Sequence, residues 1–402
     1  MLSSKCRKYE DERGTLFFPI KDGKYSNEML CNLKECTYSV NHKNVFRGLH
    51  INSFAKIITC ISGSFIDIIV DYEKNTPVVK HYLIKPGDQV YCPKNHAHGF
   101  LSLEDNSVLS YFIEDTFENE IGGLLNYRDP ILNILSNISV NVNELIINEK
   151  DSKAPYLEFE YLIIGANGFI GSNIYNELLD VGKRVYKLSH RMNEIQNIEH
   201  EILSRNPKYL ICAAGLTGTP NTKWCDTNRK QTLMTNVIEQ INILNLCNKH
   251  SIHCTLIGSG CIFNDSQTEY ISSDIGNDFS NYYSESRILL EKLVKEFENY
   301  LFLRINYPYS FKECNLDNQK NLITKLYKYE KIENCDLSAT NLDILLPKLV
   351  LLLEQKSTGI LNFVDLNQIN TVELITSFYN KNNLEFNKII VESTRSNIKL
   401  LI

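Results

Sequence analysis

Six titratable side chains in the first third of the sequence have the types that acid–base catalysis uses. All fall on or beside short apolar runs typical of β-strands: His50, Lys56, Asp67, Asp71, His98 and Tyr111. Because successive side chains of a strand point to opposite faces of a sheet, several of these groups can point into one cavity. Each of them taken singly is better explained as an ordinary strand residue or a solvated charge, so only their combination favours a site.

A second set of residues has the pattern of a dinucleotide-binding unit. The apolar run Tyr161–Ile164 leads into Gly165-x-x-Gly168-x-x-Gly171, and a helix at residues 174–181 and a strand at residues 184–188 are expected to follow. In such a unit the glycines let backbone N–H groups at a helix N-terminus reach the pyrophosphate. A glycine triplet alone is weak evidence, but in this context it predicts a nucleotide cofactor.

The tip of the second expected strand indicates which cofactor binds. It reads Ser189-His190-Arg191, with no Asp or Glu to accept hydrogen bonds from the adenosine ribose. An arginine suits the 2′-phosphate of NADP(H), so Arg191 favours NADPH over NADH. The alternative is a solvent-facing arginine.

The elements that must position these residues change character near residue 158. Residues 37–112 contain short strand-like runs without a helical period, which is typical of a β-sandwich or barrel, jelly rolls included. From residue 159 onward strands and helices alternate, as in an α/β fold with a parallel sheet. We therefore predict two domains, residues 1–158 and residues 159–402, joined almost end to end.

The composition argues against several classes of partner. With 48 Asp and Glu against 42 Lys and Arg, the net charge of −6 disfavours nucleic acid or an anionic membrane. The twelve cysteines are scattered and form no C-x-x-C pair, so we expect reduced thiols and no bound metal. Because the chain shows neither a secretory signal nor an apolar run long enough to cross a bilayer, we expect a cytoplasmic location.

Several motifs of the first domain, taken together, resemble the dTDP-4-dehydrorhamnose 3,5-epimerase family, which are cupin jelly rolls. The matching runs, in the family's order, are residues 11–14, 46–50, 55–56, 65–67, 70–71, 93 to 100, 111, 149–151 and 154–155. The resemblance implies that His50 is the base, that Asp151 orients it, and that Tyr111 is the acid on the opposite face of the sugar. Lys56 would stabilise the enolate. The implied substrate-binding residues are Arg13, Arg47 and His98.

This chemistry is coherent, because removing a proton next to a ketone needs a base near neutrality and a cation close to the developing oxyanion. Two departures from the family bear on how many carbons are inverted. The loop between His50 and Lys56 is several residues shorter, and Phe117 stands where the family often has a second tyrosine.

Residues 160 to about 397 resemble the extended short-chain dehydrogenases/reductases, and more narrowly the plant-type nucleotide-rhamnose synthases. The dTDP-4-dehydrorhamnose reductases are a more distant match. The matching runs are residues 213–218, 220–221, 224–225, 260–263, 321–325 and 345–347. The implied cofactor-binding residues, with those of the glycine turn, are Gly165, Asn167, Gly168, Phe169, Ile170, Gly171, Arg191, Ala213, Ala214, Gly215 and Asn236.

By this resemblance Ser259 and Tyr283 polarise a 4-ketone and protonate its oxygen while NADPH supplies a hydride. The family's Tyr-x-x-x-Lys is here Tyr283-x-x-x-Arg287, which keeps the charge of the lysine but not its shape. Implied substrate contacts are Thr217 and Asn221.

The plant-type enzymes place an acid/base pair for epimerisation in the reductase pocket, at the positions of Cys261 and Lys325. The alternative is that Cys261 is a small core residue and Lys325 a surface charge.

We therefore expect a bifunctional enzyme that epimerises C3, C5 or both of an NDP-4-keto-6-deoxyhexose and then reduces C4 with NADPH. The product would be a 6-deoxy-L-sugar nucleotide such as UDP- or dTDP-L-rhamnose. One alternative is a 3-epimerase/4-reductase acting on a UDP-2-acetamido-2,6-dideoxy-4-hexulose, and another is a sugar-nucleotide-binding scaffold with one silent domain. By resemblance, and because closed two-fold assembly is common, we expect a homodimer through the first domain.

Overall fold

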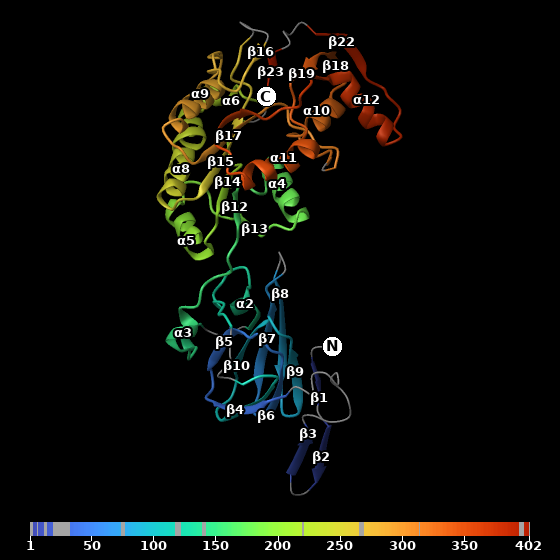
Figure 1. Cartoon of the computed structure of the whole chain (residues 1–402). Coiled ribbons are helices and arrows are strands. Elements are labelled where there is room, and N and C mark those ends of the chain that lie inside the picture. The colour runs from blue at the N-terminus through green and yellow to red at the C-terminus, as the bar shows by residue number, and fades with distance from the viewer. Residues whose placement is uncertain are drawn as a thin grey trace. The chain divides into compact units, whose positions relative to one another are not determined.

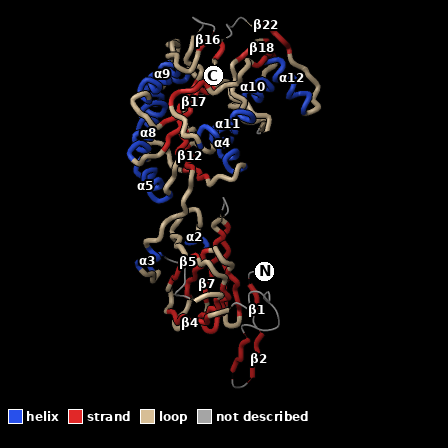
Figure 2. Tube along the Cα trace, viewed as in Figure 1, coloured by secondary structure: helices blue, strands red, loops and turns tan. Residues whose placement is uncertain are grey.

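The computed structural model divides into two compact units, Met1–Leu157 and Glu158–Ile402. It describes residues 3–5, 7–11, 14–18, 33–73, 77–116, 122–138, 142–218, 221–264, 269–312, 314–393 and 398–401. Arg13 and Phe117 lie outside the described residues. The first unit is built mainly from strands, and the second alternates strands and helices (Figures 1 and 2).

Two antiparallel sheets form the first unit, in the orders β1-β9-β6-β11-β4 and β5-β10-β7-β8, and β2 and β3 pair separately. The strands are β1 (Ser3–Lys5), β2 (Arg7–Asp11), β3 (Gly14–Phe18), β4 (Glu35–Asn41), β5 (Phe46–Ile51), β6 (Lys56–Ser62), β7 (Phe65–Asp71), β8 (Val78–Ile84), β9 (Asp88–Cys92), β10 (Ala97–Ser102) and β11 (Ser107–Ile113).

The two sheets pack face to face through apolar side chains at alternating strand positions. Ile58 and Leu109 of the first sheet share one buried cluster with Phe65, Ile69 and Phe100 of the second. Phe65 and Phe100 meet edge to face with ring centroids 5.4 Å apart. This layered antiparallel arrangement is the jelly-roll type of fold that the sequence predicts.

A closing segment after the last strand returns to the edge of the four-stranded sheet. Leu49 of β5 and Leu125 exchange backbone hydrogen bonds of 3.3 and 3.0 Å, and Ile51 N–H donates to the Gly123 carbonyl at 2.9 Å. The short helices α2 (Ile134–Ile138), η2 (Val142–Glu144) and α3 (Glu149–Ser152) follow. Because this segment is pinned to β5, residues near 151 lie beside residues near 50.

A six-stranded parallel sheet of order β13-β12-β14-β15-β17-β20 forms the centre of the second unit. Its strands are β12 (Tyr161–Ile164), β13 (Val185–Leu188), β14 (Tyr209–Cys212), β15 (His253–Ser259), β17 (Tyr300–Ile305) and β20 (Gly359–Asn362). The shorter strands of the unit are β16 (Glu269–Tyr270), β18 (Lys331–Asn334), β19 (Asp336–Leu337), β21 (Ile369–Asn370), β22 (Ile389–Glu392) and β23 (Lys399–Leu400).

Helices cover both faces of this sheet, as in a doubly wound α/β fold. The helices of the unit are α4 (Phe169–Asp180), α5 (Ile195–Arg205), α6 (Trp224–Thr227), α7 (Arg229–Leu233), η3 (Met234–Ile238), α8 (Glu239–Lys249), α9 (Tyr282–Val294), α10 (Leu322–Lys328), α11 (Leu342–Glu354) and α12 (Thr371–Lys381). α4 and α11 share the main apolar core with β12, β14 and β17, while α8 and α9 contact β15 (Figure 1). α10 and α12 form a separate small core.

The helix after the glycine turn begins five residues earlier than residues 174–181, the range expected from the sequence. Gly168 is its N-cap, so Phe169 already lies in the first turn. No helix among the described residues is long and apolar enough to cross a membrane. Within the same part of the chain, no group of three or more His, Cys, Asp and Glu side chains is placed to hold a metal ion.

Candidate active sites in the two units

The four-stranded sheet of the first unit brings three of the predicted polar residues onto one face. His50 of β5 and His98 of β10 are directly opposed in the antiparallel register, and His98 also lies opposite Ile69 of β7. Directly opposed residues share a face, and so do residues two apart along a strand, such as Asp67 and Ile69. His50, His98 and Asp67 therefore point toward the same space between the sheets.

His50 forms a dyad with Asp151, which comes from the closing segment 101 residues later in the chain. The His50 Nε2 to Asp151 Oδ1 distance is 2.9 Å, and the backbone N–H of Gly48 donates to Asp151 Oδ2 at 3.0 Å. Asn148 caps α3 by accepting from Asp151 N–H at 2.7 Å. Burial raises the pKa of Asp151, but the hydrogen bonds from His50 and Gly48 outweigh it and lower the pKa below the ordinary value.

The two members of this dyad differ in exposure. The Asp151 side chain is 1% exposed, whereas that of His50 is 32% exposed. A buried carboxylate that is hydrogen-bonded to one ring nitrogen of an accessible imidazole orients the histidine as a base.

A second histidine–carboxylate pair lies deeper between the sheets. His98 Nε2 is 2.7 Å from Asp67 Oδ2, and both side chains are almost fully buried. Burial lowers the pKa of His98 despite the neighbouring carboxylate, so His98 is held neutral. Its ring meets that of Tyr111 edge to face, with centroids 6.5 Å apart.

The opposite sheet supplies Lys56 and Tyr111. Lys56 begins β6 and is 7% exposed, and its Nζ donates to Asn52 Oδ1 at 2.7 Å. Tyr111 Oη lies 3.5 Å from Ser39 Oγ on the neighbouring strand β4. Burial raises the pKa of Tyr111, so its hydroxyl stays protonated through the physiological range and can act only as a proton donor at the start of a reaction.

Arg47, one of the predicted substrate-binding residues, is exposed, and its Nε donates to Asn41 Oδ1 at 3.0 Å. The structure thus adds Ser39, Asn41 and Asn52 to the polar residues of this unit, which sequence reasoning missed. Their side chains are short and amide or hydroxyl in type, so only the strand register distinguishes them from ordinary surface positions. Asp71 ends β7, opposite Val78 of β8.

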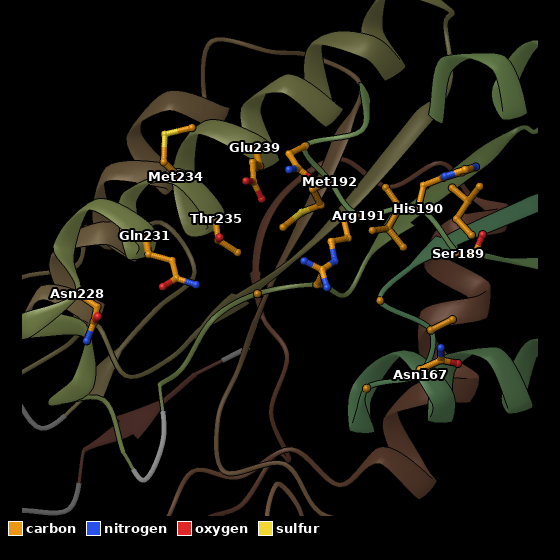
Figure 3. Close-up of a pocket in the computed structure, with 18 of the residues that line it drawn as sticks. Asn167, Ser189, His190, Arg191, Met192, Asn228, Gln231, Met234, Thr235 and Glu239 are labelled. Carbon is orange, nitrogen blue, oxygen red and sulfur yellow. The ribbon is translucent and has the colours of Figure 1, made fainter. Parts of the chain in front are cut away.

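In the second unit a cavity of about 850 Å³ opens at the carboxyl ends of β12, β13 and β14. This is the point where the strand order reverses, and ligands of doubly wound sheets bind there. Figure 3 shows Asn167 of the glycine turn on one side of it and Gln231, Thr235 and Glu239 of the helices across from it. Of the predicted cofactor residues, those that line it are Gly165, Asn167, Gly168, Arg191, Ala214 and Gly215.

The glycine turn needs its glycines for space. Gly165 has φ +78°, and a Cβ on Gly171 would lie 2.2 Å from the Gly165 carbonyl oxygen. This close approach lets α4 start directly beneath the cavity. The side chain of Phe169 is instead buried in the core, and Ile170 packs against that core. For both residues only the backbone N–H groups at the start of α4 are suited to a pyrophosphate.

Asn236 does not line the cavity but holds one of its walls. It is fully buried within the π-helical turn η3, and its side chain exchanges two hydrogen bonds of 2.8 Å with the backbone of Leu216. π-helical turns are rare and concentrate at functional sites. Here the turn fixes the 213–217 loop, which also carries the predicted Ala213.

The predicted reductase residues converge on the end of β15 and the first turns of α9. Ser259 ends β15, and its Oγ accepts from Cys261 N–H at 3.1 Å. Ser284 Oγ donates to the Cys261 carbonyl at 2.7 Å, which ties the start of α9, and with it Tyr283, to the same loop. Ser259 and Tyr283 are each 6% exposed.

Arg287 lies one helical turn after Tyr283 and is 4% exposed. Its Cζ is 5.5 Å from the centre of the Tyr283 ring, and a Cβ on Gly215 would lie 2.7 Å from its Nη2. Among the described residues, its buried Nε and Nη1 have no hydrogen-bond partner. A guanidinium buried against Gly215, which lines the cavity, fits the approach of an anionic cofactor.

Cys261 and Lys325 are within electrostatic reach of one another. Cys261 Sγ is exposed and lies 3.2 Å from Asn306 Oδ1. Desolvation by the surrounding protein raises the pKa of the Cys261 thiol, while the Ser259 hydroxyl and the charge of Lys325 act in the opposite direction.

The predicted substrate contacts Thr217 and Asn221 lie outside the cofactor cavity. Lys320 Nζ donates to Thr217 Oγ1, which joins the loop after β14 to the turn before α10. Asn221 Oδ1 accepts from Lys223 N–H at 3.0 Å.

Sequence reasoning missed much of the helical wall of the cofactor cavity. These lining residues are Thr227, Asn228, Arg229, Lys230, Gln231, Met234, Thr235 and Glu239. Asn236 is the only residue of this helical run that the sequence predicts to bind the cofactor, and the run forms the wall across the cavity from the glycine turn.

Two family models match the chain. The model described as dTDP-4-dehydrorhamnose 3,5-epimerase matches residues 1–158, and the model described as NAD dependent epimerase/dehydratase family matches residues 161–328. The predicted order of an epimerase domain followed by a nicotinamide-dependent reductase-type domain is confirmed.

Similar proteins combine these same activities. The chain is 31% identical over 228 residues to a bifunctional dTDP-4-dehydrorhamnose 3,5-epimerase/dTDP-4-dehydrorhamnose reductase from Arabidopsis thaliana, a match that covers 55% of this chain and 74% of the relative. It is 27% identical over 267 residues to a trifunctional UDP-glucose 4,6-dehydratase/UDP-4-keto-6-deoxy-D-glucose 3,5-epimerase/UDP-4-keto-L-rhamnose-reductase from the same plant, of which it spans 39% of the length.

Among solved structures, a UDP-rhamnose synthase from Acanthamoeba polyphaga mimivirus is 25% identical with a TM-score of 0.52. That match covers 58% of this chain and 85% of the synthase. More than half of this chain therefore shares its fold with that synthase.

Proposed function

The chain belongs to the family of bifunctional epimerase/reductases of nucleotide-rhamnose synthesis, and from this premise we propose that it carries out two consecutive steps on one substrate. The substrate class is a UDP- or dTDP-linked 4-keto-6-deoxyhexose. The first unit inverts C3, C5 or both, and the second unit reduces C4 with NADPH. The product is a 6-deoxy-L-sugar nucleotide such as UDP- or dTDP-L-rhamnose.

The His50–Asp151 dyad is the observation that carries this proposal. Its 2.9 Å contact joins a partly exposed imidazole to a buried carboxylate, which suits His50 to remove the proton next to the 4-ketone. Lys56 would stabilise the enolate oxygen, since a nearby ammonium lowers the energy of a developing oxyanion. Tyr111, held protonated by burial, would return a proton to the opposite face of the same carbon.

Reduction of C4 would take place in the second unit. NADPH supplies the hydride when bound in the cavity at the ends of β12, β13 and β14. Ser259 would hold the ketone oxygen, and Tyr283 would give it a proton as the negative charge develops. Arg287 would contribute a permanent positive charge beside Tyr283, because a guanidinium does not lose its proton in the physiological range.

NADPH is proposed over NADH because Arg191 lines the cavity at the end of β13 (Figure 3). The backbone N–H of Arg191 donates to Glu194 Oε2 at 2.7 Å, which holds the turn that carries Arg191. A guanidinium binds a 2′-phosphate through charge-assisted hydrogen bonds.

Cys261 and Lys325 form a second candidate pair for epimerisation, close to the reductase residues. Their use in this chain is a separate part of the proposal. A homodimer through the first unit is also proposed, and light scattering of the purified protein would test it by giving about twice the mass of the 402-residue chain.

The experiment that tests the function incubates the protein with UDP-4-keto-6-deoxyglucose in D2O and follows it by NMR, with and without NADPH. Deuterium at C3 and C5 without NADPH, followed by the L-rhamnose configuration with NADPH, is the expected result. Deuterium at C3 alone would favour the 2-acetamido-2,6-dideoxy-4-hexulose as substrate. No exchange and no NADPH oxidation with either sugar would leave the scaffold function as the better explanation.

Two variants assign the steps to the units. His50→Asn should abolish exchange and leave reduction of an already epimerised substrate intact. Tyr283→Phe should do the reverse. Loss of both activities in either variant would contradict separate sites.

A further inference from the structure

The hydroxyl of Tyr111 has one hydrogen-bond partner among the residues that the structure describes, and that partner is Ser39 at 3.5 Å. Ser39 lies on the edge strand β4, whose exposed residues Cys36, Tyr38 and Val40 alternate with inward-facing ones. Its hydroxyl therefore points to the inner face, beside Tyr111 of β11. Hydrogen bonds of catalytic groups are often long in the free enzyme and shorten when substrate binds, and 3.5 Å is such a distance.

A chain of side chains fixes the direction of this hydrogen bond. Arg47 Nε donates to Asn41 Oδ1 at 3.0 Å, and Asn41 Nδ2 donates to Ser39 Oγ at 3.1 Å. Because an arginine can only donate, the Asn41 amide must face it with oxygen and present nitrogen to Ser39. Ser39 Oγ therefore accepts from Asn41, and its own proton is left to donate to Tyr111 Oη.

The surrounding protein fixes the orientation of the Asn41 amide. Its side chain is 2% exposed, and Nδ2 also contacts the backbone carbonyls of Ser39 at 3.2 Å and Ser107 at 3.4 Å. The Ser39 hydroxyl is thus oriented by groups that are themselves held by the strand.

The charges around Tyr111 explain why a donor is needed there. Burial raises the pKa of Tyr111, and the nearby carboxylate of Asp67 adds to the effect. The Ser39 hydroxyl and the charge of Arg47 act in the opposite direction. A phenolate formed in this environment is costly unless a hydrogen-bond donor meets it.

We propose that Ser39 is a positioning residue of the epimerase site, which donates a hydrogen bond to the phenolate of Tyr111 and is itself directed by Asn41 and Arg47. The inference rests on the proposed epimerase function. His50 takes the proton from the carbon next to the ketone, and the electron pair moves onto the ketone oxygen. The Tyr111 O–H bond then breaks, a C–H bond forms on the opposite face, and the ketone is restored.

After this step His50 carries an extra proton and Tyr111 is a phenolate. Water takes the proton from His50 and returns one to Tyr111, so atoms and charges balance over the cycle. Ser39 keeps its own proton throughout. Its hydrogen bond stabilises only the state in which Tyr111 has given its proton away, and it therefore favours inversion over return of the proton from His50.

The test uses the full chain and UDP-4-keto-6-deoxyglucose in D2O without NADPH. NMR gives two rates, the entry of deuterium into unconverted substrate and the formation of inverted product. The first depends on His50 and the second also on Tyr111. Ser39→Ala is compared with Ser39→Thr, which keeps a hydroxyl, and with Tyr38→Phe, which removes a hydroxyl from the exposed face of the same strand.

Ser39→Ala should slow inversion about tenfold without slowing deuterium entry, the effect of losing one hydrogen bond to a charged group. Ser39→Thr should recover most of the inversion rate, and Tyr38→Phe should match the unchanged protein. Equal loss of both rates in Ser39→Ala would overturn the proposal, because a merely structural residue behaves in that way. An unchanged ratio of the two rates would overturn it as well. If the unchanged protein showed neither rate, the proposed function itself would fail.

Discussion

Replacing Asp151 by Asn is the most informative single change for the first unit. The substitution keeps the size of the side chain and removes its charge. The carboxylate is 1% exposed and contacts His50 Nε2 at 2.9 Å and Gly48 N–H at 3.0 Å. An amide in its place can still accept one hydrogen bond, so the fold of the closing segment should persist while the imidazolium formed by proton removal loses its anionic partner.

The magnitude follows from the contact that is lost. A hydrogen bond between charged groups contributes about 1.5–3 kcal/mol, which corresponds to roughly 10- to 150-fold in rate. We expect the upper part of that range, because water does not reach Asp151 to replace the lost charge. The effect should fall on deuterium entry and inversion alike, since both begin with proton removal by His50.

The assay is deuterium exchange into UDP-4-keto-6-deoxyglucose, measured in parallel with NADPH oxidation on an epimerised substrate. NADPH oxidation serves as the internal control for folding and concentration. Exchange in Asp151→Asn at more than half the original rate would refute the role of the dyad. A parallel loss of NADPH oxidation would show that the change disturbs more than the epimerase site.

Three further predictions concern the cofactor site and the acid stability of the first unit. Arg191→Ala should weaken NADPH binding about tenfold or more and leave NADH binding nearly unchanged, as measured by fluorescence titration; equal losses for both cofactors would contradict a 2′-phosphate contact. Gly171→Ala places a Cβ 2.2 Å from the Gly165 carbonyl oxygen and should displace the start of α4, so that NADPH binding falls at least tenfold. Gly182 follows the other end of α4 and has φ +78°, but its Cβ would meet no atom within 4 Å; Gly182→Ala should therefore lower stability through backbone strain while leaving NADPH binding unchanged, which makes it the control for a loss of stability alone. Burial lowers the pKa of His98 below its ordinary 6.5. Just below pH 6.5 the unfolded chain therefore binds a proton at His98, whereas the folded chain does not. The contribution of neutral His98 to stability is therefore fully present above pH 6.5 and is lost as the pH falls toward the folded pKa; His98→Gln should make chemical unfolding of the first unit less dependent on pH below 6.5, and an unchanged pH dependence would show that His98 does not contribute.

The prediction of the fold rested on local patterns in the sequence. The glycine turn could be predicted because its requirement is short-range: Gly165 must adopt positive φ, and Gly171 must leave room for the Gly165 carbonyl. The start of α4 could not be predicted to the residue, because Gly168 acts as an N-cap only once the turn has formed. Strand alternation likewise indicated that several polar residues of the first unit could point into one cavity, but it did not show which of them meet, and it did not single out Ser39, Asn41 or Asn52.

The sequence by itself determined the types of residue available, the order of a strand-rich region before an α/β region, and the position of Arg191 at the end of the second β-strand of that region. Only the tertiary structure determined which of these residues contact one another. Asp151 reaches His50 only because the closing segment pairs with β5, and Ser39 reaches Tyr111 only through the register of β4 and β11. Arg287 lies against Gly215 because α9 packs over the loop after β14. These contacts join residues 72 to 101 positions apart, and no local pattern records them, because strand register and helix packing are set by the whole core.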